Sequence, residues 1–196
     1  MLKIIAMMYV TLIPVILAGI MVMLWCKLPI LKGLAKPIDG GRNFTDNKRI
    51  FGDNKTWKGF LGYILFNLVF SVLWGLLCTN ESLKSLSFFY QYHENSIGFN
   101  CLIGVLLGLG YALFELPNSF LKRRLDITPG KTLTGPKKVF FIFLDQADSI
   151  FGVALVVWIF YPLGILLYLL YVLIGALTHI LLNMLLYFMK LRKNMF

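Results

Sequence analysis

The sequence has few of the residues that build disulfide frameworks, zinc sites or catalytic dyads. Its 196 residues include three cysteines and two histidines. Cys26, Cys78 and Cys101 form no CxxC pair, and each lies within or beside an apolar run. We therefore interpret them as small packing residues. His93 and His179 are far apart in the chain and belong to no motif with a cysteine or serine, which argues against a histidine-activated nucleophile.

Charged residues are scarce as well. They make up 14% of the chain, whereas hydrophobic residues make up 59%, compared with roughly 45–50% in an average soluble domain. This composition excludes a soluble fold and favours a single membrane domain over residues 1–196. Nine acidic residues stand against nineteen basic ones, which gives a formal charge of +10.

The long uncharged runs predict an all-α integral membrane protein. A spanning helix needs about 20 apolar residues. The run at 149–189 would form a helix of about 60 Å, twice the hydrocarbon thickness, and the Tyr-Pro-Leu-Gly sequence at 161–164 offers a break. The first run has 23 uncharged residues, too many for a signal-peptide core, so we expect a retained helix. Five transmembrane helices are predicted, at about 4–26, 59–80, 95–118, 139–161 and 163–189.

The basic residues predict the orientation of these helices. Seventeen of the nineteen lie in the connections 27–58 and 119–138 or in the C-terminal tail, which leaves only Lys3 and Lys84 for the other side. By the positive-inside rule both connections are cytoplasmic loops, the N-terminus lies outside and the C-terminus lies in the cytoplasm of a multi-pass cell-membrane protein. This pattern explains the charge of +10 without a nucleic-acid partner.

Two carboxylates interrupt the fourth predicted helix. Asp145 and Asp148 lie roughly 10–15 Å inside the hydrocarbon core, where each costs about 2.5–3.5 kcal/mol. Their spacing of three places both on one helix face, so their charges repel. A divalent cation such as Mg²⁺, with nearby basic residues, would compensate this cost. The alternative is a structural pair that is hydrogen-bonded or salt-bridged inside the bundle.

A second polar stripe marks the cytoplasmic end of the third predicted helix. Glu115, Asn118, Ser119 and Lys122 share one helix face. Pro117 within this stretch is expected to kink the helix end and to free backbone carbonyl groups. The stripe is either part of a polar site or a solvated helix end that enters a basic loop.

The first cytoplasmic loop contains two clusters in which glycine stands beside basic residues. Backbone amides and ammonium groups in such clusters suit phosphate binding. The alternative is a polar loop that merely follows the positive-inside rule. The candidate binding residues in this loop are Asp39, Gly40, Gly41, Arg42, Asp53, Lys55, Thr56 and Lys58.

These motifs together resemble the CDP-archaeol synthase family, which is related to the CDP-diglyceride synthases (phosphatidate cytidylyltransferases). The resemblance covers most of the chain, and five motifs occur in the order and at separations like those of the family. They are the segments 39–42, 52–59, 115–124, 129–130 and 144–148.

The resemblance implies a CTP-dependent cytidylyltransferase of phospholipid biosynthesis. A membrane lipid phosphate, of the archaetidic or phosphatidic acid type, would attack CTP and yield a CDP-activated lipid and pyrophosphate. Asp145 and Asp148 would bind Mg²⁺ and act in catalysis with Lys122, while Arg123 and the loop lysines would bind phosphate. Glu115, Asn118 and Ser119 would complete the substrate site.

Other functions are compatible with parts of this pattern. A transporter or lipid-binding protein would use the buried carboxylates for ions, although it has no need for two glycine–lysine clusters on one side. A membrane acyltransferase would need an acyl-donor site, for which the sequence has no motif. Because apolar surfaces discriminate poorly between hydrocarbon chains, we expect the protein to be highly selective for the headgroup phosphate and weakly selective for the lipid tails.

Overall fold

The structure is a computed structural model that describes residues 1–129, 135 and 138–191. Within these residues the chain is helical and contains no β-strand. Five helices are long and apolar enough to cross a membrane, so the predicted fold class is confirmed. They are α1 (Leu2–Lys27), α2 (Trp57–Leu77), α4 (Ile97–Arg124), α5 (Lys138–Phe160) and α6 (Gly164–Phe188), joined by the short η1 (Lys32–Leu34), α3 (Glu81–Lys84) and η2 (Phe89–Gln91).

Helix α4 continues beyond its predicted end. The sequence prediction placed the loop at 119–138, whereas the helix runs to Arg124 and ends on three basic residues. Positive charges in the last turn of a helix interact favourably with the helix dipole, so basic residues can belong to the helix. The first residues of the basic cluster therefore did not mark the end of α4. Three stretches lie outside the described residues: 130–134, 136–137 and 192–196. They include Gly130 of the fourth motif and two of the basic residues, Lys131 and Arg192, that were used to predict the orientation.

Side-chain caps fix where two of the long helices begin. The Thr56 hydroxyl accepts a hydrogen bond from the Gly59 amide at 3.2 Å and starts α2. The Ser96 hydroxyl accepts one from the Phe99 amide at 3.3 Å and starts α4. Each cap satisfies one of the backbone donors that a helix start leaves unpaired.

Helix α4 packs between α2 and α5. Glycines on α4 allow this close packing: a methyl group at Gly104 would lie 2.5 Å from the Leu68 Cα, and one at Gly108 would lie 2.5 Å from the Ile64 Cα. Small residues are typical of helix contacts in membranes, where van der Waals packing replaces the hydrophobic effect as the main attraction between helices. The α2–α4 pair is thus a backbone-to-backbone contact.

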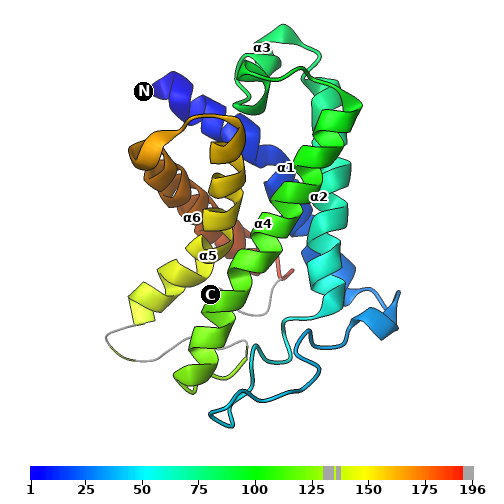
Figure 1. Cartoon of the computed structure of the whole chain (residues 1–196), viewed down its shortest axis with the longest axis vertical. Coiled ribbons are helices and arrows are strands. Elements are labelled where there is room, and N and C mark those ends of the chain that lie inside the picture. Colours follow the sequence, from blue (N-terminus) through cyan, green and yellow to red (C-terminus); the bar gives the residue numbers. More distant parts are fainter. Residues whose placement is uncertain (130–134, 136–137, 192–196) are drawn as a thin grey trace.

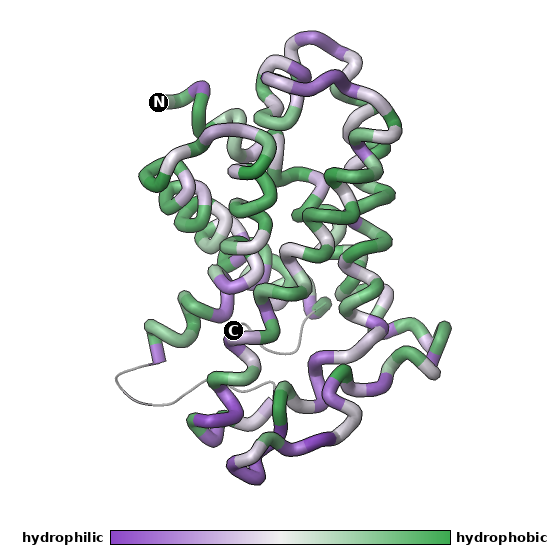
Figure 2. Tube along the Cα trace, viewed as in Figure 1, coloured by the Kyte–Doolittle hydropathy of each residue, from purple (hydrophilic) through white to green (hydrophobic). Residues whose placement is uncertain are grey.

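The polar parts of the chain gather at the two ends of the bundle. Figure 2 shows hydrophilic residues at both ends and mainly apolar residues between them. The connection 28–56 and the C-terminal end of α4 lie at one end, and the connection 78–96 with α3 lies at the other (Figure 1). Both loops that the sequence predicts to be cytoplasmic therefore begin on the same side of the molecule.

The connection at 78–96 closes its end of the bundle. Phe88 is 1% exposed, packs against Tyr161 and Tyr171, and donates its backbone amide to the Thr11 hydroxyl at 3.1 Å. Phe89 packs against Phe160. At this end of the bundle, these aromatic side chains fill the space between α1, α5 and α6. Room for polar groups between the helices is therefore found at the opposite end.

Candidate functional site

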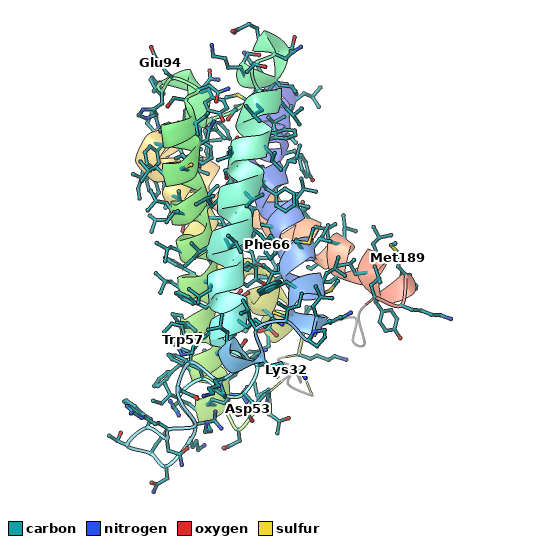
Figure 3. The ribbon with its side chains drawn as sticks, turned by 90° about the vertical axis from the view of Figure 1, so that its right-hand side faces the viewer. Lys32, Asp53, Trp57, Phe66, Glu94 and Met189 are labelled. Carbon is teal, nitrogen blue, oxygen red and sulfur yellow. The ribbon has the colours of Figure 1, made fainter. Side chains whose placement is uncertain are left out.

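A cavity of about 580 Å³ lies between the helices on the side of the basic loops. All five long helices and the connection before α2 contribute to its wall. Figure 3 shows this end of the molecule, where Lys32, Asp53 and Trp57 lie opposite Glu94. Most of the titratable residues that we selected from the predicted helices as site candidates line this cavity.

The polar stripe of α4 faces this cavity. Glu115, Asn118, Ser119 and Lys122 all line it, as their helical spacing predicted, and Arg123 joins them. Pro117 is accommodated inside α4, which continues for seven residues to Arg124. The stripe thus faces a cavity that it shares with α5.

Asp145 and Asp148 meet this stripe from α5. The Asn118 amide nitrogen donates to Asp145 Oδ1 at 2.8 Å and to Asp148 Oδ2 at 2.7 Å. Lys122 forms an ion pair with the second oxygen of Asp145, and the Ser149 backbone amide donates to Asp148 Oδ1 at 2.6 Å. One amide group therefore bridges the buried carboxylate of Asp148 and the half-buried one of Asp145, which reduces their mutual repulsion.

The same group has the chemistry of a magnesium site. Asn118 Oδ1 is buried and has no hydrogen-bond partner among the described residues. Rotating the amide by 180° would place this oxygen beside Asp145 and Asp148, which gives three hard oxygen donors in one place. Within the described residues no cluster of three or more His, Cys, Asp and Glu forms a metal site. Mg²⁺ needs only one or two carboxylates when phosphates and water complete its shell, so the residues fit this ion.

Lysine side chains bring positive charge to the cavity wall from two elements. Lys55, just before α2, forms an ion pair with Glu115 of α4. Burial lowers the pKa of the Lys55 ammonium group, but Glu115, Asp148 and Asp145 raise it by more, so this lysine stays charged. Lys122 lies on the neighbouring wall. Both ammonium groups can donate further hydrogen bonds, because each carries three N–H donors.

Arg123 offers another unsatisfied donor. Its Nε is buried without a hydrogen-bond partner in the described part of the chain. Its side chain packs over Gly52, where a methyl group would lie 3.4 Å from Arg123 Nη1 and 3.1 Å from Pro129 Cγ. Gly52 has a φ of +97°, so its position requires glycine for both conformation and space. A guanidinium group whose Nε donor is unpaired suits a phosphate oxygen.

Asp39 organises the first loop from within and does not line the cavity. Its carboxylate accepts hydrogen bonds from the Gly41, Phe51 and Gly52 amides at 2.9–3.0 Å and from Arg49 at 2.8 Å. Burial would raise the pKa of Asp39, but the Arg49 guanidinium and the three amides together hold it well below its usual range. Asp39 therefore carries a negative charge that holds two ends of the loop together.

Other loop residues predicted to bind substrate also lie outside the cavity lining. Lys58 is buried, donates to the Leu28 carbonyl at 2.6 Å and lies 5.0 Å from the centre of the Trp25 ring. Asp53 pairs with Arg49 at 2.9 Å. The remaining ones are Thr56, which caps α2, the positive-φ glycines Gly40 and Gly41, and the exposed Arg42.

Sequence reasoning missed the neutral polar wall of the cavity. Gln146 on α5 and Asn183 on α6 line it and are hydrogen-bonded to each other. His179 also lines it, with Nδ1 3.3 Å from the Gln146 carbonyl oxygen. The spacing of four between His179 and Asn183 on the otherwise apolar α6 was the available signal. The stacked Tyr63 and Tyr111 complete this inner wall.

Comparisons with known proteins agree with the sequence motifs. Residues 4–196 match the family described as CarS-like: CDP-archaeol synthase. A CDP-archaeol synthase of Pyrococcus furiosus is 35% identical over 108 residues, which are 55% of this chain and 56% of that protein. One of Archaeoglobus fulgidus is 34% identical over 158 residues, which are 75% of this chain and 76% of that protein.

A solved structure has the same fold. It is described as an intramembrane enzyme for archaeal membrane lipid biosynthesis and superposes with a TM-score of 0.57 at 23% identity, covering 89% of this chain and 91% of its own. At this identity the likeness concerns the fold alone. The match to nearly the whole chain confirms the resemblance inferred from the motifs, and this multi-pass membrane protein belongs to the CarS-like CDP-archaeol synthase family.

Proposed function

We propose that the protein is a CTP-dependent cytidylyltransferase that converts a membrane lipid phosphate, of the archaetidic or phosphatidic acid type, to a CDP-activated lipid and pyrophosphate. The family and its curated relatives, which are named CDP-archaeol synthases, support this activity. The observation that carries it is the group of Asp145, Asp148 and Asn118 beside Lys122, in a cavity at the basic end of the bundle.

The reaction requires positioning and charge neutralisation more than a protein nucleophile. An oxygen of the lipid phosphate attacks the α-phosphorus of CTP, and the bond from this phosphorus to the oxygen bridging the β-phosphate breaks. Pyrophosphate leaves with the electrons of that bond. The attacking oxygen is already anionic, so the protein need not remove a proton.

Asp145, Asp148 and the Asn118 oxygen would hold Mg²⁺. The ion would neutralise the charge of the reacting phosphates. Asn118 turns its amide nitrogen to the carboxylates in the structure, so ion binding would require the amide to rotate. Ser149 holds Asp148 through its backbone amide and keeps this carboxylate oriented toward α4.

Basic side chains would bind the phosphate oxygens. Lys122 and Lys55 are each positioned by one carboxylate and keep N–H donors for a ligand, and Arg123 has a buried donor without a partner. Lys58, Asp39 and their loop neighbours would act indirectly, because they shape the loop that presents Lys55.

The proposed orientation places the N-terminus outside and the C-terminus in the cytoplasm. The basic connection before α2 and the basic last turn of α4 lie at the cavity end, so CTP would enter from the cytoplasm. The lipid phosphate would come from the adjoining leaflet of the cell membrane.

Transfer of label from CTP tests this function directly. Purified protein with Mg²⁺ and a lipid phosphate should move label from the α-phosphate of CTP into the lipid fraction, whereas label at the γ-phosphate should appear in pyrophosphate. Label from the γ-phosphate in lipid would instead show a kinase. Folded protein that moves no label but carries lipid or ions across vesicles would establish the transporter in place of the enzyme.

A further inference from the structure

The cavity has an apolar part that the proposed chemistry does not use. One face of α1 lines it, with residues that recur every three or four positions along the helix. From the inner end outward to the loop they include Leu12, Val15, Ile16, Gly19, Ile20 and Met23. We call this part the apolar arm. Leu12 to Met23 spans eleven residues, or about 16 Å along the helix axis.

Helix α6 forms the opposite wall of the apolar arm. Gly175, Leu182 and Leu186 line the cavity from this helix, while α1 and α6 themselves make few contacts. Space therefore remains between two helices that neighbour each other at only a few points. A methyl group added at Gly19 would meet no atom within 4 Å, so the arm is open at that position.

The polar side chains on the α6 wall are bonded to the protein itself. The Thr178 hydroxyl donates to the Ile174 carbonyl at 2.8 Å. The Asn183 amide donates to Gln146, and His179 lies 3.3 Å from the Gln146 carbonyl oxygen. These contacts favour an apolar occupant, because a polar ligand beside α1 would lose its water without gaining partners there.

We propose that the apolar arm receives one hydrocarbon chain of the lipid phosphate whose headgroup reacts at Asp145 and Lys122. This proposal rests on the proposed function. The charged group and the arm belong to one cavity, so a single lipid can reach both. Lipid chains run from the headgroup toward the bilayer centre, and Leu12 lies about 22 Å along α1 from Lys27 at the basic end of the helix.

Filling the apolar arm at Gly19 tests the proposal. Gly19→Leu and Gly19→Phe add side chains where space exists, and Leu also favours a helix over Gly. Each buried methylene strengthens binding about fourfold, so displacing two or more should lower kcat/KM for a long-chain lipid phosphate at least about tenfold. A short-chain analogue and the KM for CTP should change little. The matched control is Gly98→Leu, at a helical glycine that also has open space and does not line the cavity.

The remaining outcomes would overturn the proposal. Unchanged kcat/KM for the long-chain lipid in both Gly19 variants would show that the apolar arm holds no chain, and a selective rise in the KM for CTP would show that it holds the nucleotide. Unaltered protein gives a second test, because shortening the lipid chains should lower kcat/KM until they no longer fill the arm, and a flat profile contradicts this. Absence of any cytidylyl transfer by the unaltered protein would instead refute the proposed function.

Discussion

Asn118 decides how the two intramembrane carboxylates can coexist. Its amide nitrogen bonds to both Asp145 and Asp148, while its oxygen is buried without a partner in the described residues. An unsatisfied buried acceptor costs about 1–3 kcal/mol. A cation between the carboxylates would reverse the preferred orientation of the amide, since the oxygen would then become a ligand. The residue can thus serve both arrangements by rotation alone.

Neutralising either carboxylate should abolish the metal response and most of the activity. For Asp145→Asn and Asp148→Asn we expect cytidylyl transfer to fall by roughly 10²–10³-fold or more, because the developing charge loses its stabilisation. Mg²⁺ should raise the Tm of the unaltered protein by binding its folded state and should have a much smaller effect on both variants. Transfer assays and thermal unfolding in detergent measure both effects.

The matched control for these variants is Asp126→Asn. Asp126 pairs with Lys48 outside the cavity, and its side chain is 77% exposed. We expect near-normal activity and an intact Mg²⁺ response from this variant. Asp145 and Asp148 variants that kept Mg²⁺-dependent activity would remove both residues from the proposed site.

Asp39 should make the order of the first loop dependent on pH. Its folded-state pKa lies below its unfolded value of about 3.9, so its stabilising effect is complete above that value and is lost as the pH falls through the folded pKa. In Asp39→Asn the side-chain amide nitrogen would face the Phe51 and Gly52 backbone N–H groups and could not accept their hydrogen bonds. We therefore expect hydrogen exchange at Phe51 and Gly52 to accelerate at least about fivefold at pH 7.

The difference between Asp39→Asn and the unaltered protein should shrink below about pH 4, where the Asp39 carboxyl group of the opened loop begins to be protonated while that of the ordered loop is still charged. Hydrogen exchange followed by mass spectrometry at neutral and acidic pH measures it. An equal difference at both pH values would show that the charge of Asp39 does not hold the loop.

Helix α4 combines two roles on separate stretches, with packing glycines in its first half and the polar stripe in its second. Gly104→Leu or Gly108→Leu would force the α2 and α4 backbones apart. We expect a loss of at least about 1–3 kcal/mol in stability, as in overpacked cores. Gly98→Leu, on the same helix but in open space, should leave thermal unfolding nearly unchanged. Equal Tm values for all three variants would contradict the close backbone contact.

The orientation of the whole molecule can be tested by accessibility. We expect single cysteines near Lys48 and Lys131 to react with membrane-impermeant reagents only from the cytoplasmic side, and cysteines near Glu94 only from outside, because basic loops stay in the cytoplasm. The reaction is measured in intact cells and in inverted vesicles. Labelling of the Lys48 and Lys131 loops from opposite sides would exclude both the topology and a common site.

Substrate selectivity is a property of the complete cavity. We expect ether-linked isoprenoid and ester-linked acyl lipid phosphates of similar length to react at rates that differ modestly, since an apolar wall discriminates by only about 1–3 kcal/mol per methylene difference. The dephosphorylated lipid should not react, because Lys122 and Arg123 would lose their partner. Competition between the two lipid types measures the ratio. A preference above about a thousandfold would require a contact with the linkage that the apolar arm does not provide.

The sequence by itself determined the elements and part of the site. Apolar run length requires spanning helices in lipid, because each backbone polar group must be satisfied within its own segment. Helical spacing then placed Glu115, Asn118 and Lys122 on one face, and the cost of charge in lipid singled out Asp145 and Asp148. The structure places all five residues on one cavity, and spacing could indicate this because it depends on neighbours along a single helix.

Only the tertiary structure decided which residues face the cavity. Lys58 and Asp39 turn into the loop, whereas Asn183 and His179 reach the cavity from α6, far away in the sequence. The close approach of α2 to α4 and the gap between α1 and α6 also depend on how whole helices pack. Such packing depends on side-chain shapes from several elements at once, so spacing along one helix cannot reveal it.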